Sequence, residues 1–271
     1  MIRRVTDQRV PTVLSIAGSD SGGGAGIQAD LKAFAYCGVH GMTAVTAITA
    51  QNTVGVVAVE PVEPSVIVAQ VRAVVDDIGV DAVKIGMLGN VETIGAVDHC
   101  LDLIGPVPIV LDPVMVAESG ADLLESDAKQ SLVELVLPRA GVVTPNIPEA
   151  RALTGLGEDA SQADLAAAMV ALGPDAAVVT GGHSDSLVDV FSDGSRIVEI
   201  EGPRHEATSA HGSGCTHSSS LAAFIARGLE PEAAARAARE VASRAVAYGL
   251  DSVGEGPGPV DVFGLSRAAR G

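Results

Sequence analysis

The chain alternates short runs of β-branched residues with alanine-rich stretches of helical spacing, and this alternation constrains the fold more than any other feature. It is typical of α/β proteins with a largely parallel sheet. Because most runs are continuously apolar, we expect helices to cover both faces of their strands. The sequence therefore predicts a three-layer α/β/α sandwich. The expected strands are residues 12–17, 43–50, 82–87, 109–112, 141–144 and 176–180.

One stretch breaks this alternation and predicts an antiparallel addition to the sheet. Residues 187–202 alternate in polarity around Asp193-Gly194, which is a hairpin signal. Helices are expected over residues 64–78 and 162–172, from residue 27, from residue 212 and over residues 231–248. No repeat or linker divides the chain, so we predict a single domain over residues 1–271 with a flexible segment at residues 1–11.

Composition narrows the class of ligand. The 271 residues carry a formal net charge of −17 without a local basic patch, which disfavours nucleic acid and acidic membranes as partners. Only three lysines occur, so an anionic ligand would have to be held by backbone amides, arginines and a metal ion. An odd count of three cysteines and the lack of a signal-like or membrane-spanning apolar run predict a soluble, cytoplasmic protein.

A first glycine cluster follows the first expected strand and leads into a helix. Residues 18–26 contain five glycines, which permit close approach of the backbone to a ligand at the carboxyl edge of the sheet. A dinucleotide-binding role is disfavoured because the next acidic residue after Asp30 is Glu60. None of the lysines follows a glycine, which excludes a Walker A loop. A flexible turn is the alternative interpretation.

A second glycine cluster lies at the expected start of a helix. The amides of Gly212, Ser213, Gly214 and Cys215 would converge there and, with the helix dipole, form an anion site that needs no lysine. The same field should favour the Cys215 thiolate, making it a candidate base or nucleophile. The alternative for Cys215 is a small buried residue beside a helix cap. His211 and His217 flank this loop and are interpreted as hydrogen-bonding struts, not catalysts.

Two carboxylates follow strands at the same predicted edge of the sheet. Asp112 and Glu149 are candidate Mg²⁺ ligands, because Mg²⁺ takes carboxylates together with water and phosphate oxygens. Each could instead be a helix-start or turn residue. Gln51 ends an apolar strand, where its amide could cap a turn or hydrogen-bond to a heterocycle. The histidines lack zinc-ligand spacing, so we do not expect a zinc site.

Seven segments in order resemble the hydroxymethylpyrimidine/phosphomethylpyrimidine kinases of thiamine biosynthesis, which have a ribokinase-like fold. The resemblance covers nearly the whole chain. It is carried by SIAGSDSGGGAGIQADL (15–31), TAITAQNT (46–53), KIGML (84–88), VLDPVM (110–115), TPNIPEA (144–150), GGH (181–183) and HGSGCT (211–216).

This resemblance implies ATP-dependent phosphorylation of 4-amino-5-hydroxymethyl-2-methylpyrimidine to its monophosphate and then to the diphosphate. It implies ATP as co-substrate, Mg²⁺, a homodimer, and K⁺ as a further candidate cation. Cys215 would be the base, and residues 212–215 the anion hole. The remaining roles are a pyrimidine pocket at Gly18, Asp30, Gln51 and Met87, a nucleotide side at Asn146, Thr180 and Gly182, and a metal region at Asp112 and Glu149.

The chain departs from the family pattern at two positions. Thr180 and Glu118 stand where the resemblance implies lysines, so we expect weaker binding of phosphates. Two other functions stay open: a pyridoxal or pyridoxine kinase, and a relative that binds pyrimidine or ATP without turnover. Products formed from each substrate would discriminate between them.

Overall fold

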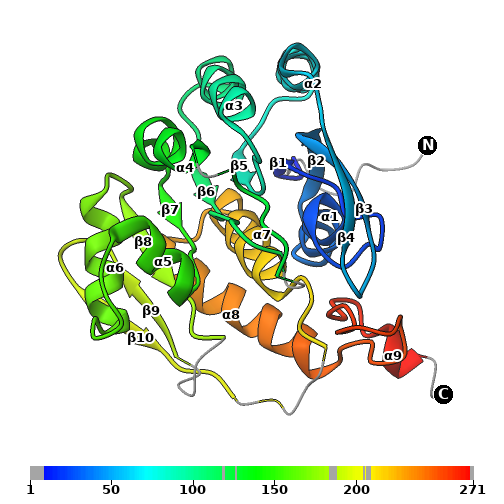
Figure 1. Ribbon diagram of the computed structural model, residues 1–271, viewed down its shortest axis with the longest axis vertical. Helices are drawn as coiled ribbons and strands as arrows, with labels where there is room; N and C mark the ends of the chain where they lie inside the picture. The colour runs from blue at the N-terminus through cyan, green and yellow to red at the C-terminus, as the bar shows by residue number, and fades with distance from the viewer. Residues whose placement is uncertain are drawn as a thin grey trace.

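The computed structural model describes residues 9–117, 120–125, 127–182, 188–203, 205 and 209–268. One eight-stranded sheet has the order β10-β9-β8-β7-β6-β5-β1-β2 and is parallel from β2 to β8, whereas β9 and β10 are antiparallel (Figure 1). The mostly parallel sheet and its edge hairpin at Asp193-Gly194 are thus confirmed. Its strands are β1 (Thr12–Ala17), β2 (His40–Val45), β5 (Ala82–Ile85), β6 (Ile109–Leu111), β7 (Val142–Val143), β8 (Ala176–Val179), β9 (Asp189–Ser192) and β10 (Ile197–Ile200).

Helices cover both faces of the sheet, which confirms the three-layer sandwich (Figure 1). One face packs against α1, α7 and α8, and the other packs against α2 to α6. The helices are α1 (Gly26–Tyr36), α2 (Pro64–Asp77), α3 (Val91–Ile104), α4 (Ala128–Ser131), α5 (Ile147–Thr154), α6 (Gln162–Ala171), α7 (Ser213–Ala226), α8 (Pro231–Ala247) and α9 (Leu265–Ala268). A π-helical turn, Leu132–Val136, and a 3-10 turn, Leu137–Arg139, follow α4.

Strand alternation decides which residues face which layer. Val13 in β1 packs on the α1/α7/α8 side, whereas its neighbour Leu14 packs on the α2 to α6 side. In β5, Ala82 belongs to the first side and Val83 to the second. Lys84 therefore projects from β5 toward α1 and α7, within the core, and this orientation brings it to the candidate site.

The expectation of one strand over residues 43–50 is wrong. Strand β2 ends at Val45, and the chain then leaves the large sheet to form β3 (Ala47–Gln51), which pairs with β4 (Val56–Pro61) in a separate two-stranded sheet. The buried Thr46 makes this corner, because its N–H donates to the carbonyl of Ala17 and its hydroxyl to that of Met87. An apolar run does not reveal where a strand changes its partner.

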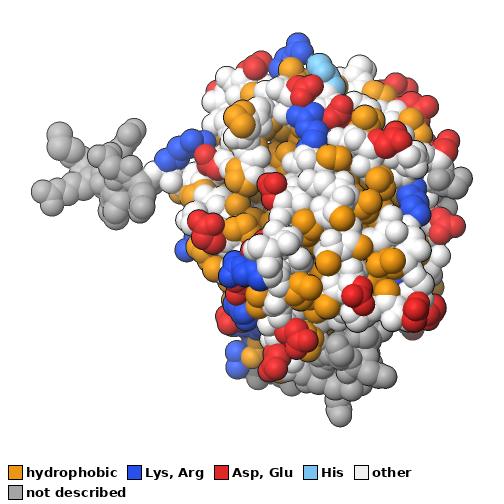
Figure 2. All heavy atoms as spheres, turned by 90° about the vertical axis from the view of Figure 1, so that its left-hand side faces the viewer, with side chains coloured by type: hydrophobic (Ala, Val, Ile, Leu, Met, Phe, Trp, Pro, Cys, Tyr) orange, Lys and Arg blue, Asp and Glu red, His pale blue; other side chains and the backbone are white. Residues whose placement is uncertain are grey.

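The expected strand over residues 12–17 is confirmed as β1. The strands expected over residues 82–87, 109–112, 141–144 and 176–180 end one or two residues earlier, because their last residues belong to loops at the carboxyl edge. The predicted flexible segment at residues 1–11 lies largely outside the described residues. No helix in the described part of the chain is both long and apolar enough to cross a bilayer. On the face that carries α5, α6 and β10, acidic and basic side chains are interspersed with apolar ones (Figure 2).

Candidate active site

Asp20 organises the glycine-rich loop after β1. Its Oδ1 accepts the N–H of Gly22 at 2.8 Å, and its Oδ2 accepts those of Gly24 at 2.9 Å and Ala25 at 2.8 Å. Nε2 of His211 lies 2.9 Å from the same Oδ2. Burial opposes ionisation, but the bonds from His211 and the backbone lower the pKa of Asp20 below its ordinary value. The loop is therefore ordered around one buried carboxylate.

The two glycine clusters contact each other directly. A Cβ on Gly24 would lie 2.1 Å from Cδ2 of His211, and a Cβ on Gly212 would lie 1.7 Å from the carbonyl oxygen of Gly24. Gly212 also has φ +83°, a conformation that favours glycine. His211 additionally bonds through its backbone to Gly258 and Val260. His211 is thus a strut between three loops, as the sequence predicted.

The anion loop forms the start of α7, with Gly212 as its N-cap. The N–H of Ser213 donates to the carbonyl of Ala210 at 3.0 Å, so this amide is not available to a ligand, contrary to the prediction. Among the described residues, the N–H groups of Gly212, Gly214 and Cys215 have no backbone acceptor. Three amides, not four, are therefore free to bind an anion at the positive end of the helix.

Beneath this loop lies a buried ion pair. Asp30 and Lys84 are both fully buried, with Nζ of Lys84 at 3.0 Å from Oδ1 of Asp30 and 3.7 Å from Oδ2 of Asp112. The hydroxyls of Ser15 and Ser219 each donate to Asp30 at 2.6 Å. Burial disfavours the ammonium, yet Asp30 raises the pKa of Lys84 above its ordinary value. Asp30 was predicted to line the pocket but does not, because its carboxylate is paired with Lys84. Lys84 itself lines the pocket.

The expectation that the field at α7 favours the Cys215 thiolate is wrong. Burial raises the pKa of Cys215 to about 12, Lys84 lowers it, and the carboxylates of Asp112 and Asp30 raise it further. Desolvation and two neighbouring negative charges therefore dominate over the favourable amides. The side chain remains half-buried and lines the pocket, so it is accessible to a ligand as a thiol.

Asp112 directly follows β6, and Glu149 lies in the first turn of α5, which follows β7; both line the pocket, and their charges interact. Asp112 accepts the hydroxyl of Ser218 at 2.9 Å, and Oε2 of Glu149 accepts the N–H of Asn146 at 2.9 Å within a capping box. Burial, and then the charge of Asp112, raise the pKa of Glu149 to about 8. Burial likewise raises the pKa of Asp112. Glu149 and Asn146 are thus helix-capping residues that also line the pocket.

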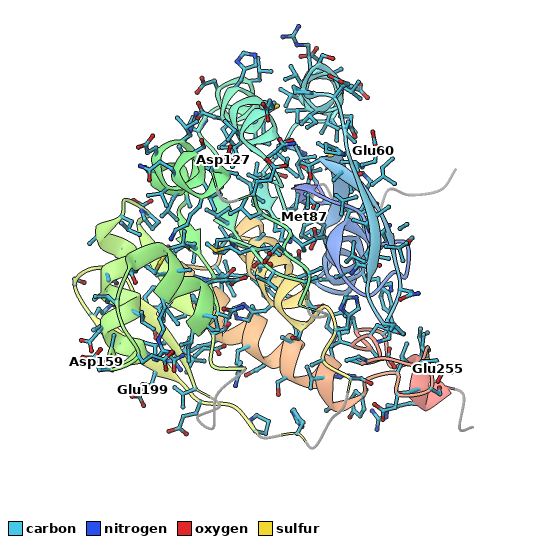
Figure 3. All side chains as sticks on the ribbon, in the orientation of Figure 1. Glu60, Met87, Asp127, Asp159, Glu199 and Glu255 are labelled. Carbon is cyan, nitrogen blue, oxygen red and sulfur yellow. The ribbon has the colours of Figure 1, made fainter. Side chains whose placement is uncertain are left out.

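Three of the four predicted pyrimidine residues, Gly18, Gln51 and Met87, line the same pocket near β1 and β3. A Cβ on Gly18 would meet Cε of Met87 at 2.9 Å, so the absence of a side chain lets the Met87 thioether lie over this loop. Met87 lies near the middle of the molecule, beside the N-terminal strands, whereas Glu60 on β4 lies at the periphery (Figure 3). Oε1 of Gln51 accepts the Thr49 hydroxyl at 3.2 Å, leaving the Gln51 amide at the pocket wall.

All predicted site residues except Asp30 line one cavity of about 330 Å³. Thr180 and Gly182, the predicted nucleotide-side residues, line the cavity after β8, where the N–H of Thr180 donates to the carbonyl of Pro145 at 2.9 Å. Glu118 and His183 lie outside the described residues. The cavity is also lined by residues that the sequence analysis assigned no role in the site: Asp20, Thr49, Lys84, Asp189 and Arg239. A lysine inside an apolar strand was the one signal that could have revealed Lys84.

The protein belongs to the class of α/β small-molecule kinases with a ribokinase-like fold. Three features define this class here: a mostly parallel sheet between helical layers, an amide-lined helix N-terminus, and two carboxylates at the carboxyl edge. The family model described as phosphomethylpyrimidine kinase matches residues 20–261. The chain therefore belongs to the phosphomethylpyrimidine kinase family.

Relatives cover nearly the whole chain. The hydroxymethylpyrimidine/phosphomethylpyrimidine kinase of Rhizobium meliloti is 47% identical, covering 92% of this chain and 96% of its own. The hydroxymethylpyrimidine/phosphomethylpyrimidine kinase of Streptomyces coelicolor is 45% identical, and the match covers 93% of this chain and 94% of the relative. Among solved structures, a Bacillus subtilis pyridoxal kinase in complex with ADP superposes with a TM-score of 0.87 at 36% identity, covering 95% and 99%. A Clostridium difficile phosphomethylpyrimidine kinase superposes with a TM-score of 0.76 at 38% sequence identity, and the match covers 86% of this chain and 97% of that chain.

Proposed function

We propose that the protein transfers the γ-phosphoryl group of ATP to the hydroxymethyl oxygen of 4-amino-5-hydroxymethyl-2-methylpyrimidine, and then phosphorylates the monophosphate to the diphosphate, in thiamine biosynthesis. The observation that carries this proposal is the free amide set of Gly212, Gly214 and Cys215 between a Gln51/Met87 end and a Thr180/Gly182 end of one cavity. Two substrates could meet there across an anion site. The named activities of the relatives support the same reaction.

The geometry suits phosphoryl transfer, which depends on positioning and charge stabilisation more than on covalent chemistry. The free amides at α7 would stabilise charge on the transferred group. Gln51 would hydrogen-bond to the edge of the pyrimidine ring, and Met87 would pack on its face. As the hydroxymethyl oxygen bonds to phosphorus and the bond to ADP breaks, the alcohol proton would pass to the thiolate form of Cys215, the minor form of this side chain at neutral pH.

Mg²⁺ is the proposed metal, bound by Asp112 and Glu149. The described residues contain no cluster of three or more metal-ligating side chains, but Mg²⁺ commonly binds one or two carboxylates together with substrate phosphates and water. The mutual repulsion that raises the pKa of Glu149 would be relieved by a divalent cation, so these residues fit it. Bound Mg²⁺ would neutralise phosphate charge. K⁺ is proposed as a further cation whose ligands are not assigned.

We further propose a homodimer of single-domain subunits in the cytoplasm. Ile48, Val57 and Val59 on the β3/β4 sheet are exposed by 59%, 81% and 42%, and such apolar surface is the kind that subunits cover. The acidic surplus and the small cavity support a small-molecule substrate and not a nucleic acid or membrane partner.

The decisive test offers ATP and Mg²⁺ with hydroxymethylpyrimidine, its monophosphate or pyridoxal in separate reactions, with products identified by mass spectrometry. Diphosphate from both pyrimidine reactions and little pyridoxal phosphate is the expected result. The similarity to pyridoxal kinase structures makes vitamin B6 the second candidate substrate. Product from pyridoxal alone would replace the proposal by that activity, and no product from folded protein would favour a binding protein without turnover.

Replacing Gln51 by alanine should raise KM for the pyrimidine and leave KM for ATP within about twofold. The reason is that a pocket amide that hydrogen-bonds to a ring discriminates through that bond, an effect of roughly 1–3 kcal/mol. Steady-state kinetics with each substrate varied in turn measures the two constants. Equal increases in both constants would remove Gln51 from this role.

Replacing Cys215 by alanine should lower kcat at least about tenfold while pyrimidine binding, measured by calorimetry, survives. Because the pKa of this thiol is raised to about 12, the thiolate fraction grows with pH, and wild-type kcat should rise toward alkaline pH. The variant should lose that rise. Unchanged turnover, or an unchanged pH profile, would exclude Cys215 as the base.

Replacing Glu149 by glutamine should stabilise the metal-free protein at alkaline pH. The pKa of Glu149 is raised from 4.5 to about 8, so the folded protein keeps this side chain neutral up to about pH 8. The stability that this neutral form contributes is fully present below pH 4.5 and is lost as pH rises from 4.5 through about 8. Glutamine keeps an acceptor for Asn146 without the buried charge. Thermal unfolding should give a higher Tm for the variant above pH 8 and nearly equal values near pH 4.5; a difference independent of pH would contradict this account.

A further inference from the structure

A cluster of buried polar groups lies between β9, α7 and α8, beside the nucleotide end of the cavity. Nη1 of Arg239 donates to Oδ1 of Asp189 at 3.1 Å, and the N–H of Gly181 donates to the same oxygen at 3.0 Å. Nε2 of His217 lies 3.8 Å from Oδ2 of Asp189. Arg239, Asp189 and His217 all line the cavity. One carboxylate thus connects a cation on α8 to the backbone just after Thr180.

The charges around the cavity single out Arg239. Among the described lining residues, the arginine and lysine side chains are Arg239 and Lys84, against four carboxylates. Lys84 is fully buried and ion-paired with Asp30. The Arg239 side chain retains 15% exposure and lies beside Gly202, where a Cβ would come within 2.6 Å of its Nε. Both cations are ion-paired, but of these two described residues Arg239 is the one whose side chain retains exposure, so it is the one that can reach a ligand.

His217 supplies the second, independent observation. It is 3% exposed, and neither ring nitrogen has a hydrogen-bond partner among the described residues, so the prediction that His217 is a hydrogen-bonding strut is wrong. Burial lowers its pKa, so the ring is neutral near pH 7 and carries one N–H donor. Oδ2 of the fully buried Asp189 also has no hydrogen-bond partner among the described residues, but as an acceptor it would hold the neighbouring cation and would not contact an anion. The unsatisfied N–H of His217 on the cavity wall therefore points to a ligand that accepts its hydrogen bond.

We propose that Arg239 and His217, with Asp189 holding the guanidinium, form the subsite that binds the polyphosphate of the nucleoside triphosphate. The inference rests on the proposed kinase function and assigns residues to its nucleotide end. Arg239 would contact phosphate oxygens through its fork of donors, and the His217 N–H would add a neutral hydrogen bond. Asp189 is a positioning residue, since it acts through Arg239.

The test compares binding of ATP, ADP and AMP by calorimetry to wild type, Arg239→Gln and Arg236→Gln. Arg236 is the matched control, because it lies on the same helix but pairs with Glu232 on the surface. Loss of a charge-assisted contact should weaken ATP binding about 10–100-fold for Arg239→Gln, with a smaller loss for AMP, and Arg236→Gln should match wild type. ATP affinity within twofold of wild type, or equal losses for ATP and AMP, would overturn the subsite.

Two further variants separate recognition from folding. Arg239→Gln/Asp189→Asn removes both buried charges and keeps an acceptor for the Gly181 N–H, so it remains a test if Arg239→Gln alone unfolds. Arg239→Lys should recover part of the ATP affinity, and no recovery in folded protein would count against a cationic role. ATP binding that depends on Arg239 without turnover of any pyrimidine or pyridoxal would refute the proposed reaction while leaving the subsite standing.

Discussion

Replacing Gly212 by alanine is expected to lower kcat by about 100-fold or more, the magnitude seen when a donor of an anion hole is lost. The residue adopts φ +83°, and an added Cβ would lie 1.7 Å from the carbonyl oxygen of Gly24. Both backbones must move apart to accommodate it. That movement displaces the free amides at the start of α7, so KM for ATP should change less than kcat.

The control for this variant is Gly95→Ala in α3. Gly95 is helical, and an added Cβ there would meet no atom within 4 Å. Alanine should therefore leave turnover unchanged and stabilise the helix slightly. Steady-state assays and thermal unfolding of both variants measure the contrast. A Gly212→Ala enzyme with near wild-type kcat would show that the contact between the two glycine clusters does not position the anion hole.

Replacing Lys84 by methionine is expected to lower the free energy of unfolding by about 3–5 kcal/mol, because it leaves the Asp30 carboxylate buried without its cation. Both side chains are fully buried, and only the hydroxyls of Ser15 and Ser219 would remain to hold the charge. Urea unfolding followed by circular dichroism measures the loss. The exposed pair Arg236 and Glu232 gives the comparison, since Arg236→Met should change stability by less than about 1 kcal/mol.

A double variant isolates the charge from the packing. Lys84→Met/Asp30→Asn removes both ions and retains a side chain that the two serines can contact, so it should be more stable than Lys84→Met alone. A double variant that is less stable than the single one would show that methionine packing, and not the unpaired carboxylate, limits stability. Turnover of the double variant then reports how much the buried cation contributes to the anion site above it.

Periodicity predicted the three layers and the mostly parallel sheet, because continuous apolar runs must be covered on both faces. It failed at residues 43–50, where Thr46 redirects the chain through hydrogen bonds to Ala17 and Met87. Those partners lie 29 and 41 positions away, so no local pattern contains them. The strand β4 was not anticipated either, because much of its surface is exposed and its partner is the redirected strand β3.

The sequence located most residues of the candidate site because its motifs place glycines and carboxylates directly after strands. In a parallel sheet the carboxyl ends of all strands lie at one edge, so these residues come together there. The prediction was wrong for residues whose role depends on how deeply the side chain is buried. Asp30 was expected in the pocket but is enclosed by Lys84, and the Cys215 thiol was expected to ionise readily but is desolvated beside Asp112. The spacing of residues in the sequence shows neither how deeply a side chain is buried nor which charged side chains face it across the cavity.

The contact between Asp20 and His211 has a consequence for biosynthesis. The two residues are 191 positions apart, and His211 is further held by Gly258 and Val260 near the end of the described chain. A growing polypeptide can pair its early strands on the ribosome, but it cannot order this joint until residue 260 has emerged. Catalytic competence should therefore appear abruptly after that point of translation, and chains that stop before residue 258 should not bind the pyrimidine and ATP productively.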